Sequence, residues 1–443
     1  MTDISPVPND LDAFWMPFTP NRHFKANPRL LARAEGMYYW DVAGRKILDG
    51  MAGLWCVNAG HARAPIARAI AAQAAELDFA PSFQFAHPKV FQLASRIVAL
   101  APPSLEHVFF VNSGSEAADT ALKIARAYFQ AKGEGQRFRL IGRERAYHGV
   151  NFGGLSVGGI GNNRKAYGPL VPGTDDHLPL PYDRARHGFT PTEWEGGDAY
   201  ADALERIVAV HGANTIAAVI VEPMTGSGGV FPPPKGYLQR LRAICDRHGL
   251  LLILDEVITA FGRLGHAFAA ERYGIIPDMI CFAKGITNGA VPLGGVLVSK
   301  KIHDAFAQAD DHAINLFHGY TYTGHPLAMA AGLATLDLYR EEGLFERGKA
   351  LEPALSDAVH ALKGAPFVID IRSIGMAAAV ELEPASGAPG KRGYEAMQRL
   401  FKEQNLVLRL SGDTLVLAPS LIASADEITR MAESIRAVLG KLS

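Results

Sequence analysis

Cysteine is scarce in this chain. Three of its 443 residues are cysteines, and Cys56, Cys245 and Cys281 stand far apart in apolar surroundings. An odd number of scattered cysteines fits reduced thiols and excludes a disulfide framework. No C-x-x-C pair and no H-E-x-x-H segment occurs, so the sequence predicts no metal site.

An excess of charge of either sign is also missing. Lysine and arginine total 44 against 45 aspartates and glutamates, which gives a formal net charge of -1 at pH 7. This balance provides no general attraction to nucleic acid or to an anionic membrane, so we expect neither as a partner. Small molecules and other protein chains are the expected partners.

Long apolar runs are absent as well. No stretch reaches the roughly 20 residues that cross a bilayer. The N-terminal segment MTDISPVPNDLDAFW carries an acid and two prolines, and no positively charged segment leads into an apolar signal core. Because 48% of the residues are hydrophobic, the chain can bury a large core. We therefore expect a cytoplasmic globular enzyme of two or three domains.

Several common catalytic motifs fail. No G-x-G-x-x-G opens a helix after a strand, and no G-x-x-x-x-G-K-[ST] occurs. One pattern does match: GLSVG fits the G-x-S-x-G turn of hydrolases around Ser156, with Asp255 and His318 following in the right chain order. That turn needs a helix after the serine, whereas the following GGIGNNRKAYGP is expected to form none. A serine hydrolase is therefore a weak alternative.

The middle of the chain has the pattern of an α/β protein. From about Pro88 to Lys300, apolar β-branched runs alternate with amphipathic segments, as in strands and helices around a mostly parallel sheet. The clearest buried strands are TIAAVIVEP, LLLILDEV, MICFAK and GGVLVSK. Later, LVLRLSGDTLVLAPSL has the pattern of two strands around a turn, and a Ser424–Glu427 capping box begins a terminal helix.

The expected fold class is thus α/β, with a mostly parallel central sheet and a smaller α+β domain built from both chain ends. The N-terminal EGMYYWDVAGRKILDGMAGLW has short alternating strands that can join the smaller domain. We place the N-terminal part of the small domain at residues 1–60, the large domain at 61–331 and the C-terminal part of the small domain at 332–443.

A turn between a strand and a helix has the features of an anion site. The segment FFVNSGSEAADTALKIARAYF is an apolar strand, then Asn112-Ser113-Gly114-Ser115, then an amphipathic helix. Free backbone N–H groups and the helix dipole at such a start attract an anion, for example a phosphate. A plain serine cap is the alternative, and for this motif alone it is the more frequent outcome.

An acid and an amine are expected at the same edge of the sheet. LLLILDEV ends a strand with Asp255, and MICFAK ends another with Lys284. Open α/β sheets bind ligands at the carboxyl ends of their strands. Between Phe282, Ala283 and Gly285 the amine should be partly desolvated, which lowers its pKa and favours the neutral nucleophile that forms a Schiff base. Together with a phosphate site, these groups describe a site for pyridoxal phosphate (PLP).

The sequence resembles the class III, or ω-, aminotransferases of PLP-dependent fold type I. The resemblance covers nearly the whole chain and is carried by DGMAGLWCVNAGH, NSGSEA, AYHG, VEPMTGSGG, LDEVITAFGR, FAKGITNG, HGYTYTGHP and LRLSGDTLVLAP. Within the family, the ω-amino acid:pyruvate (β-alanine:pyruvate) aminotransferases are the most similar group. The resemblance implies a ping-pong transfer of an amino group from an ω-amino acid or primary amine to pyruvate, which gives an aldehyde or ketone plus alanine.

The resemblance implies roles for residues around the cofactor. Lys284 would hold PLP covalently and, once released, move the proton between the substrate carbon and C4′ of the cofactor. Asp255 would pair with the pyridine nitrogen and keep it protonated. Tyr147 would stack on one face of the ring and Val257 would pack on the other. Glu222 would be an acid near the cofactor, although a structural hydrogen bond is equally compatible with the sequence.

The resemblance also implies an assembly. Ser113, Gly114 and Ser115 would hold the phosphate, and Thr321 would reach the phosphate of the cofactor in the neighbouring subunit. The expected assembly is therefore a homodimer with shared active sites, and a tetramer is left open.

Two positions bear on the substrate. Trp55 resembles the tryptophan at the pocket entrance of the family, and Arg409 the flexible arginine that receives a carboxylate. The alternatives are a buried core tryptophan and an edge-strand arginine. Ornithine and 4-aminobutyrate aminotransferases have a glutamate that pairs with this arginine, whereas this chain has Ser227 in the corresponding place. The difference favours pyruvate over 2-oxoglutarate; those two activities and an aminomutase stay as alternatives.

Overall fold

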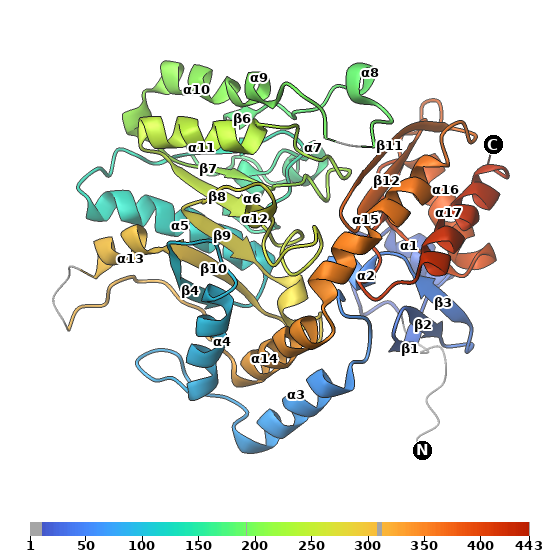
Figure 1. The fold of residues 1–443 in the computed structure, drawn as a ribbon, viewed down its shortest axis with the longest axis horizontal. Coiled ribbons are helices and arrows are strands. Elements are labelled where there is room, and N and C mark those ends of the chain that lie inside the picture. Colours follow the sequence, from blue (N-terminus) through green and yellow to red (C-terminus); the bar gives the residue numbers. More distant parts are fainter. Residues whose placement is uncertain (1–10, 192, 308–311, 443) are drawn as a thin grey trace.

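The computed structural model describes residues 11–191, 193–307 and 312–442. The first ten residues, on which the expected lack of a signal segment partly rests, lie outside this part. Figure 1 shows a large sheet flanked by helices and, beside it, a smaller region in which blue N-terminal and red C-terminal segments lie side by side. None of the helices formed by the described residues has the length and apolar character needed to cross a membrane.

The large region is built on a sheet whose strands, among the described residues, follow the order β4-β10-β9-β8-β7-β5-β6. Strands β5 to β9 pair in parallel, whereas β10 runs antiparallel to both β9 and β4. The prediction of a mostly parallel sheet is confirmed. The strand bounds are Leu105–Val111 (β4), Arg139–Arg143 (β5), His177–Leu178 (β6), Ile216–Val221 (β7), Leu251–Asp255 (β8), Met279–Phe282 (β9) and Gly294–Ser299 (β10).

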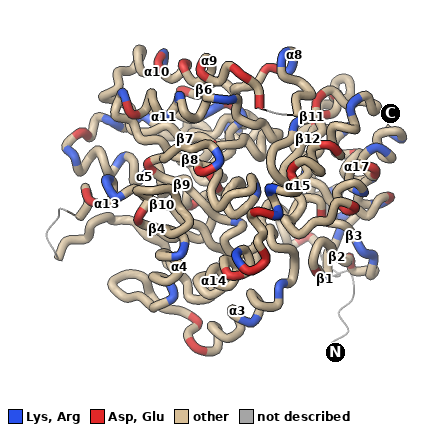
Figure 2. The backbone as a smooth tube through the Cα atoms, in the orientation of Figure 1, with Lys and Arg blue, Asp and Glu red and all other residues tan. Residues whose placement is uncertain are grey.

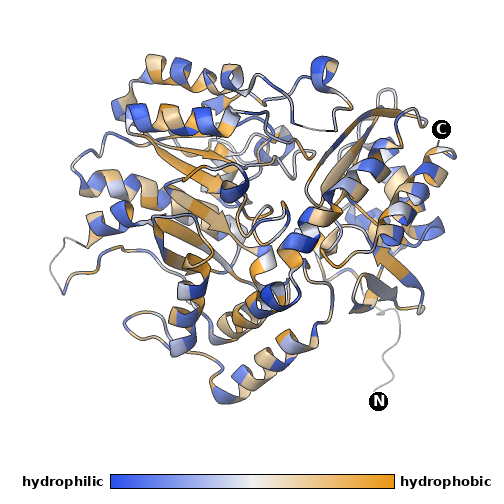
Figure 3. Cartoon of the chain, viewed as in Figure 1, coloured by the Kyte–Doolittle hydropathy of each residue, from blue (hydrophilic) through white to orange (hydrophobic). Residues whose placement is uncertain are grey.

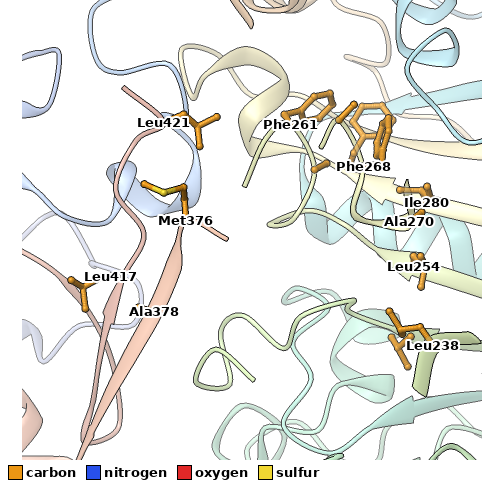
Figure 4. Close-up of a cluster of buried hydrophobic side chains, with 14 of the residues drawn as sticks. Leu238, Leu254, Phe261, Phe268, Ala270, Ile280, Met376, Ala378, Leu417 and Leu421 are labelled. Atoms are coloured by element: carbon orange, nitrogen blue, oxygen red, sulfur yellow. The ribbon is translucent and has the colours of Figure 1, made fainter. Parts of the chain in front are cut away.

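Both faces of this sheet are buried, because successive residues of a strand point to opposite sides and the strands are apolar throughout. Ile253 belongs to a buried cluster with residues of α5 (Gly114–Ala131). Its neighbour Leu254 points the other way and packs with Leu238 of α11 (Tyr237–His248), as Figure 4 shows. In Figure 3 the strands are accordingly orange, while the helices have one hydrophobic and one hydrophilic side.

Three longer helices lie below the sheet in Figure 1: α3 (Ala64–Glu76), α4 (Pro88–Val98) and α14 (Pro326–Glu341), with α14 packed against both others. The predicted boundary between residues 331 and 332 falls inside α14, and the domain limits stay a prediction. The remaining helices of this region are α6 (Phe152–Val157), α7 (Gly161–Arg164), α8 (Arg184–His187), α9 (Gly197–Ala201), α10 (Ala203–His211), α12 (Ala269–Arg272), α13 (Lys300–Phe306) and the 3-10 helices η1 (Ala213–Thr215) and η2 (Lys284–Thr287).

The smaller region combines both chain ends. One sheet has the order β1-β2-β3-β13, in which the late strand β13 pairs in parallel with the early strand β3. This confirms the expected α+β region built from both ends, and the capping box at Ser424 and Glu427 is present. A second, antiparallel sheet has the order β11-β12-β15-β14.

Helices α15, α16 and α17 complete this region, and charged residues of both signs are interspersed along it in Figure 2. Its bounds are β1 Leu31–Glu35, β2 Tyr38–Asp41, β3 Lys46–Asp49, β11 Val368–Ile374, β12 Ala377–Leu382, β13 Leu406–Val407, β14 Arg409–Ser411, β15 Thr414–Leu417, α1 Asn21–Ala26, α2 Ala52–Trp55, α15 Leu344–His360, α16 Lys391–Glu403 and α17 Ala425–Leu439.

A buried arginine joins the two regions. The guanidinium of Arg263 donates from Nη1 to the carbonyls of Met376 and Pro419, and from Nη2 to Asn58 Oδ1 at 2.7 Å. Burial lowers the pKa of Arg263 to about 10. Since three segments far apart in the sequence meet at one side chain, this contact fixes both chain ends against the edge of the large sheet.

Candidate active site

The carboxyl ends of the parallel strands meet at one pocket. Strand β8 ends at Asp255, while Glu222 follows β7 and Lys284 follows β9 two residues later. The cavity between them, about 140 Å³, is lined by Gly114, Ser115, Tyr147, His148, Gly149, Glu222, Asp255, Val257, Ile258 and Lys284. A larger depression of about 670 Å³ has no lysine among its lining residues, and in another of about 550 Å³ the amine of Lys301 is ion-paired with Asp278, so the chemistry of the lining identifies the site.

Lys284 occupies a strained position at the end of β9. Its φ is +51°, in the left-handed region that non-glycine residues seldom adopt, and it begins the 3-10 helix η2. Burial is the main cause that lowers the pKa of the Lys284 amine, while Cys56 and Asp255 oppose this shift. A lowered pKa increases the fraction of neutral amine, which is the nucleophilic form.

Asp255 is held in a fixed orientation. Its Oδ2 lies 2.7 Å from Nδ1 of His148, both side chains are buried, and its Oδ1 accepts the N–H of Val257 at 3.1 Å. The Nε2 of His148 is buried without a hydrogen-bond partner among the described residues. A histidine that holds a functional carboxylate fixes its orientation.

Sequence reasoning missed His148. The available signal was its place in AYHG, directly after the predicted stacking residue Tyr147. A pairing between β8 and the segment after β5 is visible only once the sheet order places these strand ends together.

Glu222 connects two segments of the pocket wall. Its Oε1 accepts the N–H of Tyr147 at 3.0 Å, and its Oε2 accepts the N–H of Gly226 at 2.8 Å. Burial raises the pKa of Glu222, while His148 and Arg143 act in the opposite direction. The carboxyl group therefore has the structural hydrogen bonds considered from the sequence, and it also faces the pocket.

The start of α5 forms another wall. Ser113 is the N-cap, and its Oγ accepts the N–H of Glu116 at 3.1 Å, so the plain cap considered from the sequence is present. The first N–H groups of a helix have no partner within it, and here Gly114 and Ser115 line the pocket. The helix start thus combines a cap with free donors that suit an anion.

Two glycines make this wall possible. A Cβ at Gly114 would stand 2.7 Å from Cγ1 of Val257, too close without movement. Gly149, with φ +99°, lies against Ser115. A Cβ added to Gly149 would be 2.6 Å from the Cα of Ser115. The chain therefore approaches the helix start more closely than a residue with a side chain would allow.

These residues fit PLP. The start of α5 suits its phosphate, the buried carboxylate of Asp255 suits a protonated ring nitrogen, and Lys284 offers an amine to its aldehyde. Tyr147 and Val257 both line the same pocket, as expected for groups on either side of a flat ring. Bound there, PLP supplies an aldehyde that captures amines and a ring that accepts electrons.

Thr321 does not line this pocket. It is exposed in the segment between α13 and α14, beside a turn in which the N–H of Thr323 donates to the carbonyl of Tyr320 at 3.0 Å. Its predicted contact with the phosphate in a neighbouring subunit stays a prediction.

The two predicted substrate residues lie around the pocket, outside its immediate lining. Trp55 is only 1% exposed and belongs to a buried cluster with Ile258, which does line the pocket. Trp55 is therefore buried in the same cluster as a residue of the pocket wall, and its place at the entrance stays a prediction. Arg409 begins β14; burial lowers its pKa, while Tyr147 and Glu222, which both line the pocket, act in the opposite direction.

The hydrolase alternative is not supported. Ser156 is in the short helix α6, and its Oγ donates to the carbonyl of Phe152 at 2.5 Å. The expectation that no helix follows was wrong in part, because residues 161–164 form the single turn α7. However, Asp255 bonds to His148 and His318 bonds to Thr120, so these two residues form no triad with Ser156.

Comparisons with known proteins agree with this site. The model of the class-III aminotransferase family matches residues 20–439. An ω-aminotransferase of Caulobacter vibrioides is 56% identical over 98% of each chain, and a β-alanine–pyruvate aminotransferase of Pseudomonas aeruginosa is 47% identical over 99% of this chain and 98% of the other. A solved amine transaminase from an uncultivated Pseudomonas species, in its PLP-bound form, is 36% identical with a TM-score of 0.90, covering 98% of this chain and 100% of that one.

The family match spans nearly the whole chain, and the pocket gathers the amine, the carboxylate and the helix start in one place. The fold is that of the PLP-dependent transaminases. This protein is therefore a PLP-dependent enzyme that belongs to the class-III aminotransferases.

Proposed function

We propose that this aminotransferase moves an amino group from an ω-amino acid or a primary amine to pyruvate, with alanine as the second product. The names of its relatives, an ω-aminotransferase and a β-alanine–pyruvate aminotransferase, support this choice of substrates. The observation that carries it in this chain is Ser227, which stands beside the strand of Arg409 without a carboxylate.

The contact between the two segments is direct. Ser411, in the same strand as Arg409, donates its hydroxyl to the carbonyl of Ser227 at 3.0 Å. The Nε of Arg409 is buried and has no hydrogen-bond partner among the described residues. The guanidinium is thus available for one substrate carboxylate, as in pyruvate. The second carboxylate of 2-oxoglutarate would have to be buried without an equivalent partner, which is costly.

The protein groups then have distinct tasks. The Lys284 amine moves a proton to and from the substrate carbon that bears the nitrogen, and Asp255 holds the proton on the ring nitrogen of the cofactor. Glu222 fixes the backbone N–H of Tyr147, so the aromatic side chain keeps its orientation. Arg409 pairs with the substrate carboxylate and leaves room for uncharged amines.

A homodimer with shared sites is part of the proposal. The exposure of Thr321 in this chain is compatible with a contact to a second subunit. The expected cytoplasmic location stays a prediction.

The choice of acceptor provides a direct test. With β-alanine or 1-phenylethylamine as donor, pyruvate should react at least about tenfold faster than 2-oxoglutarate at matched concentration. Burying the unpaired second carboxylate of 2-oxoglutarate costs free energy, and each ~1.4 kcal/mol of this cost lowers the rate tenfold. Initial rates of alanine and glutamate formation measure this ratio. Equal rates would contradict the role assigned to Ser227.

Arg409 should matter for one kind of substrate. We expect Arg409→Ala to lose about one to three orders of magnitude in kcat/KM for β-alanine or pyruvate, the scale of a charged hydrogen-bonded pair. The half-reaction of 1-phenylethylamine with the PLP form, followed spectroscopically in a single turnover, should change little because this amine has no carboxylate. Equal slowing of both half-reactions would make Arg409 a structural residue.

Thr321 tests the shared site. Thr321→Ala should weaken PLP retention, and a mixed dimer with Lys284→Ala chains should regain activity, because one of its two sites then has both Lys284 and Thr321. Activity is compared between the mixture, refolded or coexpressed, and each parent variant alone. A mixture no more active than the sum of the parents would count against a contact across the interface.

A further inference from the structure

The segment after β3 has a strained backbone. Ala52, Gly53 and Trp55 have φ values of +47°, +69° and +65°. Of these, only glycine adopts the left-handed region without steric cost. Two non-glycine residues in this region within four positions therefore require contacts that hold them there.

Asp49, the last residue of β3, supplies these contacts. Its Oδ1 accepts the N–H of Met51 at 3.0 Å, and its Oδ2 accepts the N–H of Gly53 at 2.6 Å. The Nε2 of His61 lies 2.8 Å from the same Oδ2. Asp49 is 1% exposed, so each of these contacts is made without competition from water.

The chain from the strained residues to Gly60 is connected to the pocket walls at two points. Trp55 packs with Ile258, which lines the pocket. Further along the chain, the side chain of Asn288 makes two hydrogen bonds to the backbone. Its Oδ1 accepts the N–H of Ala59 at 2.8 Å, and its Nδ2 donates to the carbonyl of Gly60 at 2.7 Å. Because Asn288 directly follows η2, these bonds join the segment to the turn of the reactive lysine.

The same junction continues to the arginine. The N–H of Gly50 donates to the carbonyl of Val407 at 2.9 Å, where β3 pairs with β13. Arg409 is two residues beyond Val407 and begins β14. The segment of Trp55 is thus held by Asp49, and the strand that leads to Arg409 is held by the neighbouring Gly50.

We propose that Asp49 is a positioning residue for the substrate side of the active site. Its carboxylate keeps residues 51–55 in the conformation that places Trp55 in the buried cluster of the pocket-wall residue Ile258, and it does so beside the strand that leads to Arg409. It contacts neither substrate nor cofactor and acts through these two residues. The inference rests on the proposed function, because Arg409 is the residue that binds the substrate carboxylate there.

Asp49→Asn tests this role. The amide keeps the size of the side chain but turns one acceptor into a donor, which would face either an N–H group or the imidazole. We expect the KM for β-alanine and for pyruvate to rise about tenfold, since small displacements of positioning groups cost this much or more. The kcat should stay within about threefold, and PLP retention should be unchanged, because Lys284 and Asp255 keep their places.

Tryptophan fluorescence supplies a second readout. Four tryptophans are present, so the Trp55 signal is obtained by subtracting the spectrum of a Trp55→Phe protein from that of its parent. In the Asp49→Asn background we expect this difference spectrum to shift to the red and to become more accessible to acrylamide. A loss of general stability alone would leave the Trp55 emission of the folded holoenzyme unchanged.

Asp278→Asn is the matched control. Asp278 is also buried and accepts a backbone N–H, that of Leu252 at 2.7 Å, but it lies away from the strained segment. The Asp278→Asn substitution should leave the KM for β-alanine, the KM for pyruvate and the Trp55 spectrum unchanged. A similar rise in KM for Asp278→Asn would mean that loss of any buried carboxylate suffices, and the proposal would be overturned.

Gly53→Ala disturbs the same segment and leaves Asp49 unchanged. If Asp49→Asn does not fold, this variant tests the positioning role instead. An alanine at φ +69° would have its Cβ 3.1 Å from Val57 Cγ2, so the same rise in KM and the same red shift are expected. Folded variants with unchanged KM and Trp55 emission would refute the positioning role. A wild-type enzyme that transfers no amino group to pyruvate would refute the proposed function instead.

Discussion

Lys284→Ala should abolish turnover, with kcat at least about 10⁴-fold below that of the wild type. The variant loses both the amine that binds the cofactor covalently and the group that moves the proton at the substrate carbon. It should still bind PLP, because the start of α5 and Asp255 are untouched. Single-turnover absorbance and alanine formation from pyruvate measure the loss.

Covalent labelling separates this role from a structural one. Borohydride reduction of the wild-type holoenzyme should fix the cofactor on Lys284, and peptide mapping should find no adduct in Lys284→Ala. The exposed Lys235, ion-paired with Glu195, serves as control, and Lys235→Ala should keep full activity. An adduct on any other lysine of the wild-type protein would refute the assignment.

Asp255→Asn should have the second largest effect, a loss of about 10² to 10⁴ in kcat with a folded protein. An amide keeps the shape but removes the negative charge that holds a proton on the ring nitrogen, a preorganised electrostatic contribution. The absorption spectrum of bound PLP and its response to pH should shift as well. Stopped-flow measurement of the amine half-reaction isolates the affected step.

His148 provides the graded comparison. Since its Nδ1 contacts Asp255 at 2.7 Å, His148→Phe should give a smaller loss, about tenfold, by releasing the carboxylate from its fixed orientation. Combined with Asp255→Asn it should add little, because both changes act on the same hydrogen bond. Full additivity of the two losses would contradict the action of His148 through Asp255, and an unchanged kcat in Asp255→Asn would contradict the pairing with the ring nitrogen.

The chemistry of the site follows from local patterns in the sequence. Apolar runs that end in Asp255 and in Lys284 predict strand ends, and carboxyl ends of parallel strands share one edge of the sheet. The turn at Ser113 to Ser115 is likewise a local signal, because a helix start needs only its own backbone to attract an anion. These residues could be named from the sequence because strand ends and helix starts are determined within a few positions.

The structure determined what depends on neighbours distant in sequence. His148 meets Asp255 only because β5 and β8 are close in the sheet, and no local pattern contains that order. Trp55, whose place at the pocket entrance stays a prediction, is buried in one cluster with Ile258, since the fold packs the N-terminal segment against the loop after β8.

The sequence alone thus determined the fold class and, through short motifs and the family resemblance that they carry, the cofactor; the roles of Lys284 and Asp255 stay predictions. The tertiary structure decided how the substrate side is held: Asn288 bonded to Ala59, β13 beside β3, and Ser411 bonded to Ser227. These contacts join segments up to several hundred residues apart. Their geometry depends on how the whole chain packs, which composition and spacing do not encode.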